Sequence, residues 1–125
     1  MHREALLRWL DDRLQRVERE FTIHAGGKTT CQLHKSAETT DRLKYDEGQL
    51  VALHNIRRAL QQIEAWHPDT AQTLVEDERA RWDRMLNTYR AAARPAPAWL
   101  AYSQGGLDAL EALLSVLGDG RRDDS

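Results

Sequence analysis

Three side chains of metal-ligand type, His24, Cys31 and His34, lie close together in the first third of the chain. Zinc and other borderline metal ions bind sulfur and imidazole groups of this kind. In an extended segment side chains alternate between two faces, so Cys31 lies opposite both histidines. The sequence has no fourth ligand at a usual spacing, and the same alternation separates a cysteine nucleophile from a histidine base. We therefore expect no metal site, no catalytic cysteine and no cofactor.

Two further patterns resemble phosphate-binding or catalytic motifs but lack essential parts. Gly27-Lys28-Thr29 matches the end of a phosphate-binding P-loop, yet that motif also needs a glycine at position 22, which is threonine here, and a helix afterwards. Glu76, Asp77 and Glu78 follow one another directly, so on a helix their carboxylates point in different directions. Neither pattern supports catalysis, and the sequence predicts a protein that is not an enzyme.

The best candidate for a binding surface is a polar strip on one expected helix, made of His54, Arg57, Arg58 and Gln61. Most arginines of this chain have an acidic residue three or four positions away, whereas Arg57 and Arg58 have none upstream. Guanidinium groups without such partners bind phosphates or carboxylates. The strip therefore indicates contact with nucleic acid or with an acidic partner, and a solvated helix face is the alternative.

Four tryptophans are many for a chain of 125 residues. Trp82 fits the core pattern of its segment. Trp9, Trp66 and Trp99 fall instead near segment ends or at the edges of apolar stripes. Tryptophans in such places are enriched at protein interfaces, and they also plug the ends of helical bundles. Both readings stay open, and we count these three residues as candidate partner contacts.

The composition is that of one small helical domain without a strong electrostatic field. Charged residues make up 30% of the chain and the net charge is −2, so no overall basic charge attracts nucleic acid or membrane. No apolar run approaches the length that crosses a bilayer. The single cysteine, Cys31, excludes an internal disulfide and fits a reducing compartment. We expect a cytoplasmic protein without a signal peptide, with residues 1–117 forming the domain and residues 118–125 a disordered tail.

Apolar residues recur at helical spacing in four segments, which we expect to be helices at about 3–20, 40–66, 69–93 and 98–117. Asp69 is the expected cap of the third helix, and Gly105-Gly106 is expected to bend the fourth. The inward-facing residues of the first three helices are expected to be Leu7, Leu10, Leu14, Val17 and Phe21; Leu43, Leu50, Leu53, Ile56, Leu60 and Ile63; and Leu74, Val75, Trp82, Met85, Leu86 and Tyr89. The fourth helix carries Trp99, Leu100, Leu107, Leu110, Leu113, Leu114 and Leu117.

Between the first two helices the apolar period changes to two, which predicts a β-hairpin over residues 21–34. A three-residue loop at 26–28 pairs Ile23 with Cys31 and Phe21 with Leu33, so that the apolar groups share one face. Such a hairpin has two open edges that can pair with another chain. The edges and the uncovered apolar face predict a homodimer related by a two-fold axis.

A pattern starting at Tyr45 and Gly48 recurs at Tyr102 and Gly105, displaced by 102 − 45 = 57 residues. Glycine and alanine four positions apart leave a shallow strip on a helix, where another backbone can approach closely. The two segments are therefore expected to form the centre of the bundle. At the same offset the match does not extend upstream, so duplication and a separately acquired packing solution both remain possible.

These observations predict a mainly α protein, a small four-helix bundle with a β-hairpin inserted between helices 1 and 2. The expected function is non-catalytic: a protein–protein interaction or assembly module that self-associates and also binds an unidentified protein. The alternative is an accessory subunit or inhibitor of a nucleic-acid-handling complex, which it contacts through His54, Arg57 and Arg58. No membrane contact is expected.

Overall fold

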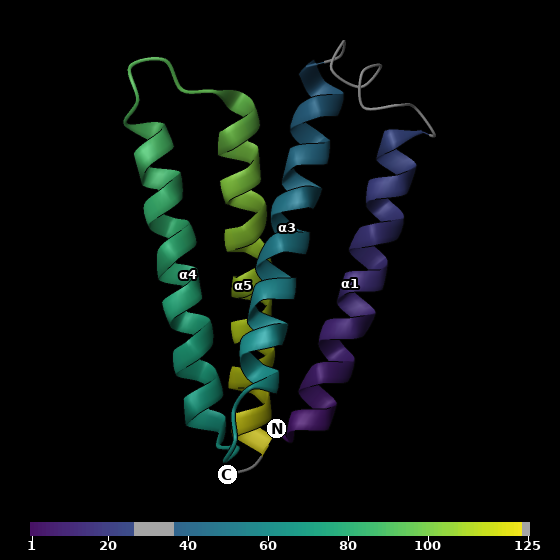
Figure 1. Ribbon diagram of the computed structural model, residues 1–125, viewed down its shortest axis with the longest axis vertical. Helices are drawn as coiled ribbons and strands as arrows, with labels where there is room; N and C mark the ends of the chain where they lie inside the picture. The colour runs from purple at the N-terminus through teal and green to yellow at the C-terminus, as the bar shows by residue number, and fades with distance from the viewer. Residues whose placement is uncertain (27–36, 124–125) are drawn as a thin grey trace.

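The computed structural model describes residues 1–26 and 37–123, and within them all regular structure is helical (Figure 1). The chain runs up α1, down α3, up α4 and down α5 in the view of Figure 1, so α3 and α5 are parallel to each other. A four-helix bundle is therefore confirmed. The helices are α1 (Arg3–Ala25), α3 (Ala37–Gln61), α4 (Pro68–Arg90) and α5 (Pro97–Asp123).

The parallel helices α3 and α5 form the centre of the bundle, held together by two reciprocal glycine contacts. A Cβ atom on Gly48 would lie 2.9 Å from the carbonyl carbon of Tyr102, and a Cβ on Gly105 would lie 2.9 Å from that of Tyr45. Only glycine lets the two backbones come this close. The expectation that both glycine strips meet another backbone is correct, and each strip meets the other.

The reciprocal contact relates α3 to α5 by a local two-fold axis parallel to the helices, and the outer helices follow the same relation. α1 packs on α3 and α4 packs on α5, so the chain consists of two helical hairpins. Both outer helices have 23 residues. Three of the four buried positions of α1 have a buried counterpart in α4 at an offset of 65, because 71 − 6, 75 − 10 and 82 − 17 are all 65. The connection before α3 is longer than the one before α5, so the outer helices follow a larger offset than the inner pair. The repeat seen at an offset of 57 residues therefore does not extend upstream.

The core lies along the centre of the bundle and consists of aliphatic side chains with one tryptophan. Its buried members are Leu6, Leu10, Leu14, Val17, Ala52, Leu53, Ile56, Leu60, Ala71, Val75, Trp82, Leu86, Leu107, Ala109, Leu110, Leu113 and Leu117. Most were expected from the helical spacing, whereas Leu6 was missed. Trp99, which was placed near the end of its segment as a candidate partner contact, is 43% exposed.

The predicted β-hairpin is wrong, because its first strand is the last turn of α1. Residues 21–25 are helical, and Gly26 ends the helix with a φ of 57°. The amide of Gly26 donates to the carbonyl oxygens of Thr22 and Ile23, at 3.1 and 3.0 Å, which is a usual glycine cap. Phe21 and Ile23 therefore belong to a helix, and the predicted strand pairs of Ile23 with Cys31 and of Phe21 with Leu33 are wrong. Cys31, Leu33 and His34 lie outside the described residues.

Several helix ends also differ from the expected ones. His67 caps α4, with its Nδ1 atom accepting from the amide of Asp69 at 3.0 Å, so Asp69 belongs to the first turn instead. α3 ends at Gln61 rather than near Trp66, and α5 continues through Gly105-Gly106 to Asp123. None of the described helices combines the length and the apolar character needed to cross a membrane.

Candidate partner-binding groove

A groove separates α3 from α4, two neighbouring helices that touch each other far less than either touches α5. Its lower part holds a cavity of about 440 Å³ that is open to solvent. The walls carry both apolar and charged groups. They consist of Asn55, Ile56, Arg58 and Ala59 from α3 and of Leu74, Asp77, Glu78 and Arg81 from α4. The lower groove can therefore hold an apolar side chain flanked by charged ones.

The carboxylate of Glu78 lines this cavity although the residue is only 8% exposed. One of its oxygens accepts from the indole Nε1 of Trp82 at 3.2 Å, and the other lies 3.3 Å from the guanidinium of Arg81. These contacts satisfy a polar atom of a buried tryptophan and compensate a largely buried charge. Glu78 is thus a supporting residue of the α4 wall.

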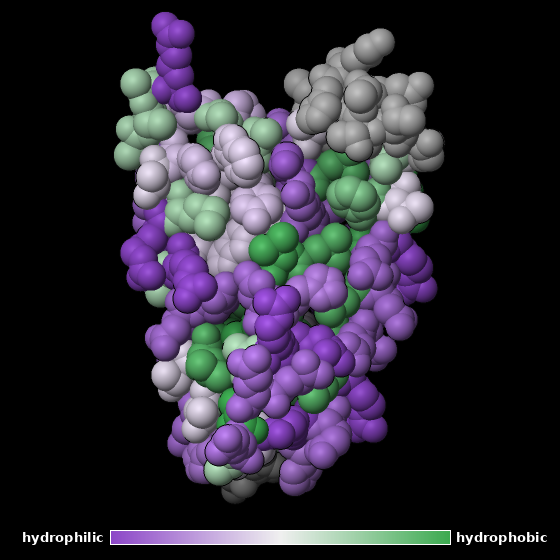
Figure 2. All heavy atoms as spheres, viewed as in Figure 1, coloured by the Kyte–Doolittle hydropathy of each residue, from purple (hydrophilic) through white to green (hydrophobic). Residues whose placement is uncertain are grey.

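Above this pocket, a cluster of aromatic rings lies on α4 and α5 and reaches Lys44 of α3. Tyr89 and Trp99 are stacked, with ring centres 6.0 Å apart and planes 16° apart. Tyr102 meets Trp99 edge to face at 5.7 Å and lies 5.2 Å from the ring of Trp82. The ammonium of Lys44, on α3, is 5.1 Å from the centre of the Trp99 ring. In Figure 2 weakly polar, pale side chains cover the upper part of the visible face between α4 and α3.

The two tyrosines that the two-fold axis relates differ in their hydrogen bonding. The hydroxyl of Tyr45 donates to Asp108 at 2.6 Å, and burial together with this carboxylate raises the pKa of Tyr45 to about 12. The hydroxyl of Tyr102 has no hydrogen-bond partner in the described part of the chain. Burial, followed by the nearby charge of Glu47, raises the pKa of Tyr102 as well. Only Tyr102 therefore offers a free donor.

The counterpart of the aromatic cluster in the other half of the molecule is polar. His24 and Arg42 take the positions that Tyr89 and Trp99 take, since 89 − 65 = 24 and 99 − 57 = 42. The Nδ1 atom of His24 lies 2.5 Å from the carboxylate of Asp46, which is 2% exposed, and Arg42 Nε donates to His24 Nε2 at 3.3 Å. Both imidazole nitrogens are engaged. This arrangement joins α1 to α3.

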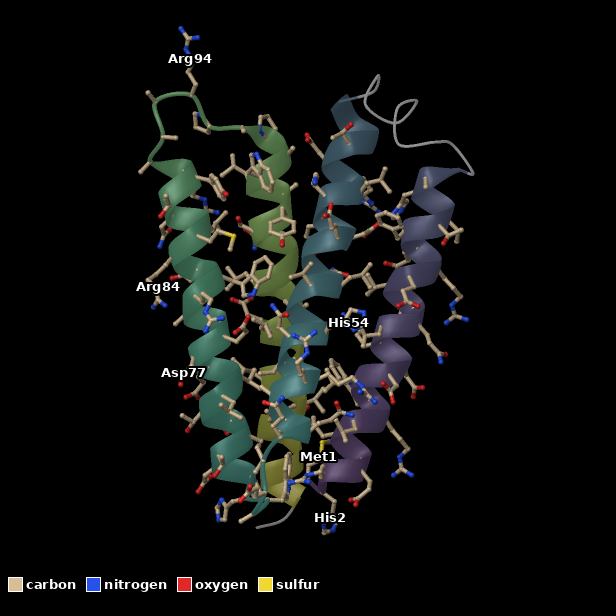
Figure 3. All side chains as sticks on the ribbon, viewed as in Figure 1. Met1, His2, His54, Asp77, Arg84 and Arg94 are labelled. Atoms are coloured by element: carbon tan, nitrogen blue, oxygen red, sulfur yellow. The ribbon has the colours of Figure 1, made fainter. Side chains whose placement is uncertain are left out.

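The polar strip predicted on α3 does not form one surface. Arg57 makes two hydrogen bonds to Asp11 of α1, at 2.7 and 3.3 Å. His54 also turns toward α1, with Nε2 at 3.9 Å from Glu18 (Figure 3). Arg58 lines the groove on the other side of the helix. Gln61 is exposed at the end of α3.

The acid that pairs with Arg57 belongs to another helix, so the spacing rule applied within one helix could not find it. Of the strip, only Arg58 belongs to the groove between α3 and α4.

The three tryptophans flagged as partner contacts have different roles. Trp66 is half-buried at the lower end of the bundle, where its indole donates to the carbonyl of Met1 at 3.2 Å. Trp9 is half-buried against the core, and the guanidinium of Arg13 lies 5.8 Å from its ring centre. Trp99 alone belongs to the aromatic cluster. Of the residues that line the groove, only Arg58 was a candidate for partner contact, and Tyr102 of the aromatic cluster was known only from the repeated pattern.

No protein family, curated protein or solved structure matches this chain. Within residues 1–26 and 37–123, no three histidine, cysteine or acidic side chains are grouped in a way that could hold a metal ion. A functional hypothesis thus has to rest on the surface of the molecule, where the charged groove and the aromatic cluster above it are the most distinctive features.

Proposed function

We propose that this protein is a non-catalytic interaction module that binds a protein partner in the groove between α3 and α4. The observation that carries the proposal is Trp99, a large aromatic side chain that is 43% exposed at the upper end of the groove. Tyr89 and Tyr102 hold its ring in place on two sides. Rigid tryptophans of this kind lose little entropy on binding and frequently dominate the energy of protein interfaces.

The rest of the groove supports the same proposal. Helical partners commonly place an apolar face in a groove between two helices and align their polar residues with its rims. Ile56, Ala59 and Leu74 supply the apolar part here, and Arg58 and Asp77 supply charges on opposite walls. The hydroxyl of Tyr102 adds a hydrogen-bond donor. These features resemble the centre and rim of a protein interface.

Self-association is part of the same proposal. It can no longer rest on open strand edges, because residues 21–25 form the last turn of α1 and not a β-strand. A cytoplasmic location is also part of the proposal and rests on the single cysteine. The alternative, contact with a nucleic-acid-handling complex through His54, Arg57 and Arg58, gains no support from the geometry. The guanidinium of Arg57 is occupied by Asp11, and His54 and Arg58 lie on different sides of α3.

The test is a binding experiment with Trp99→Ala and a matched control. Ile23→Ala is suitable because Ile23, on α1, is the other strongly exposed large apolar residue of the described chain. The wild type and each variant are cross-linked in cells of the source organism. Mass spectrometry then identifies the proteins bound to each, including further copies of the same chain. We expect Trp99→Ala to lose the bound protein and Ile23→Ala to retain it, with both variants keeping the helical circular dichroism spectrum. Equal capture by Trp99→Ala and the wild type would refute the proposal.

A further inference from the structure

We propose that the occupant of the groove is a second copy of this chain, related to the first by a two-fold axis that runs along the groove parallel to the helices. The inference rests on the proposed function, since it names the partner of the same groove. Its basis is the distribution of charge on the two walls.

Opposite charges lie on opposite walls of the same cavity. Arg58 of α3 and Asp77 of α4 line the same cavity, and both are exposed. Within the described residues, neither side chain has an ion-pair partner. Asp77 lies at the outer edge of α4 (Figure 3), so a charge contact there belongs to the rim of an interface. A single chain therefore presents one unpaired charge of each sign across the groove.

A two-fold axis along the groove places the α4 helix of a second copy over α3 of the first. Arg58 then faces the partner's Asp77, and the same contact is formed a second time on the other side of the axis. An axis perpendicular to the helices would instead place Arg58 opposite the partner's Arg58. The charges thus select one of the two face-to-face arrangements, and rim charges act mainly on specificity of this kind.

The size of the face is also sufficient for a dimer. α4 has 23 residues, which gives a length of about 35 Å at 1.5 Å per residue. Two adjacent helices are roughly 20 Å wide. The face therefore offers on the order of 700 Å² per subunit, close to the ~800 Å² that each partner buries in an interface of ordinary size. Trp99, whose ring contacts Lys44 of α3, adds an exposed aromatic group at one end of this face.

The experiment is sedimentation equilibrium of the full chain and of charge-reversal variants, over a concentration series that extends to tens of micromolar. We expect the wild type to dimerise and Arg58→Glu and Asp77→Arg each to weaken the dimer about tenfold or more, because like charges then meet at both rims. An equimolar mixture of the two variants should dimerise as tightly as the wild type, since both rim contacts then join opposite charges. Arg16→Glu, on the exposed side of α1, is the control and should change nothing.

Two outcomes overturn the inference. One is a wild type that remains monomeric throughout the series. The other is a wild type that dimerises while both charge-reversal variants dimerise equally well, or while an equimolar mixture of the two variants fails to dimerise. A monomeric wild type whose other bound protein is lost in Trp99→Ala refutes the second copy and retains the proposed function. A protein partner that neither Trp99→Ala nor the reversals affect refutes both. Circular dichroism of each variant identifies any loss that comes from unfolding.

Discussion

Replacing Gly48 with alanine tests the contact that holds the two halves of the bundle together. The new Cβ would lie 2.9 Å from the carbonyl carbon of Tyr102 and 3.2 Å from the amide nitrogen of Gly106. Both are backbone atoms, so no side-chain rotation can relieve the overlap, and α3 must move away from α5. Overpacking of this kind costs about 1–3 kcal/mol, and a clash with backbone belongs in the upper half of that range.

Alanine also favours a helix over glycine by about 1 kcal/mol, which partly offsets the clash. The net loss expected for Gly48→Ala is therefore about 1–2 kcal/mol, or a fall in Tm of about 4–8 °C for a domain of this size. Gly118→Ala is the matched control, because nothing lies within 4 Å of a Cβ at that position of α5. There the helix propensity acts alone, and Tm should rise by up to about 4 °C.

The reciprocal geometry adds a second requirement. Gly105→Ala should cost about as much as Gly48→Ala, because its Cβ would meet the backbone of Tyr45 in the same way. The double variant should lose less than the sum, because either alanine alone already separates the helices. Differential scanning calorimetry of the four variants measures all of these differences. If Gly48→Ala raised Tm as Gly118→Ala is expected to do, the close approach of α3 and α5 would be refuted.

Two further predictions concern the polar contacts of the bundle. His24→Ala should lower the free energy of unfolding by about 1–3 kcal/mol, because it leaves the carboxylate of Asp46 buried without its imidazole partner; an unchanged urea midpoint would contradict the contact. The pKa of Tyr45 is raised from 10.0 to about 12, so its stabilising contribution is fully present below pH 10 and is lost as the pH rises toward 12. Ultraviolet titration of the phenolate in the wild type and in Tyr45→Phe checks this, and a tyrosine that ionises near pH 10 in the wild type but is missing in the variant would disprove it.

The helical core could be predicted from the sequence because its signal is repeated many times. Apolar residues at spacings of three and four identify most of the buried faces, and the recurrence of tyrosine and glycine identifies the central pair. The prediction of a β-hairpin was wrong because its first strand was inferred from only five residues, Phe21 to Ala25. Gly26 directly after them is a strong signal for the end of a helix, and it was interpreted as a turn between strands.

The groove could not be predicted because its parts belong to different helices. Spacing along one helix cannot show that Arg57 pairs with Asp11, or that Arg58 lies opposite Asp77. The buried role of Glu78 depends on the indole of Trp82 one turn further along α4. That pair has the spacing of a helical contact, and it could have been found if an indole had been considered as a donor to a carboxylate.

The reciprocal glycine contact also constrains how such a chain can evolve. A substitution at either Gly48 or Gly105 disturbs both helices, so the two positions have to be preserved together across the two halves. Positions away from this seam are free of that coupling. Arg42 and Trp99 occupy equivalent positions, yet Arg42 makes a polar contact between α3 and α1, whereas Trp99 presents an aromatic ring to solvent. A shared inner seam thus allows the two halves to diverge in surface chemistry while they keep a single fold.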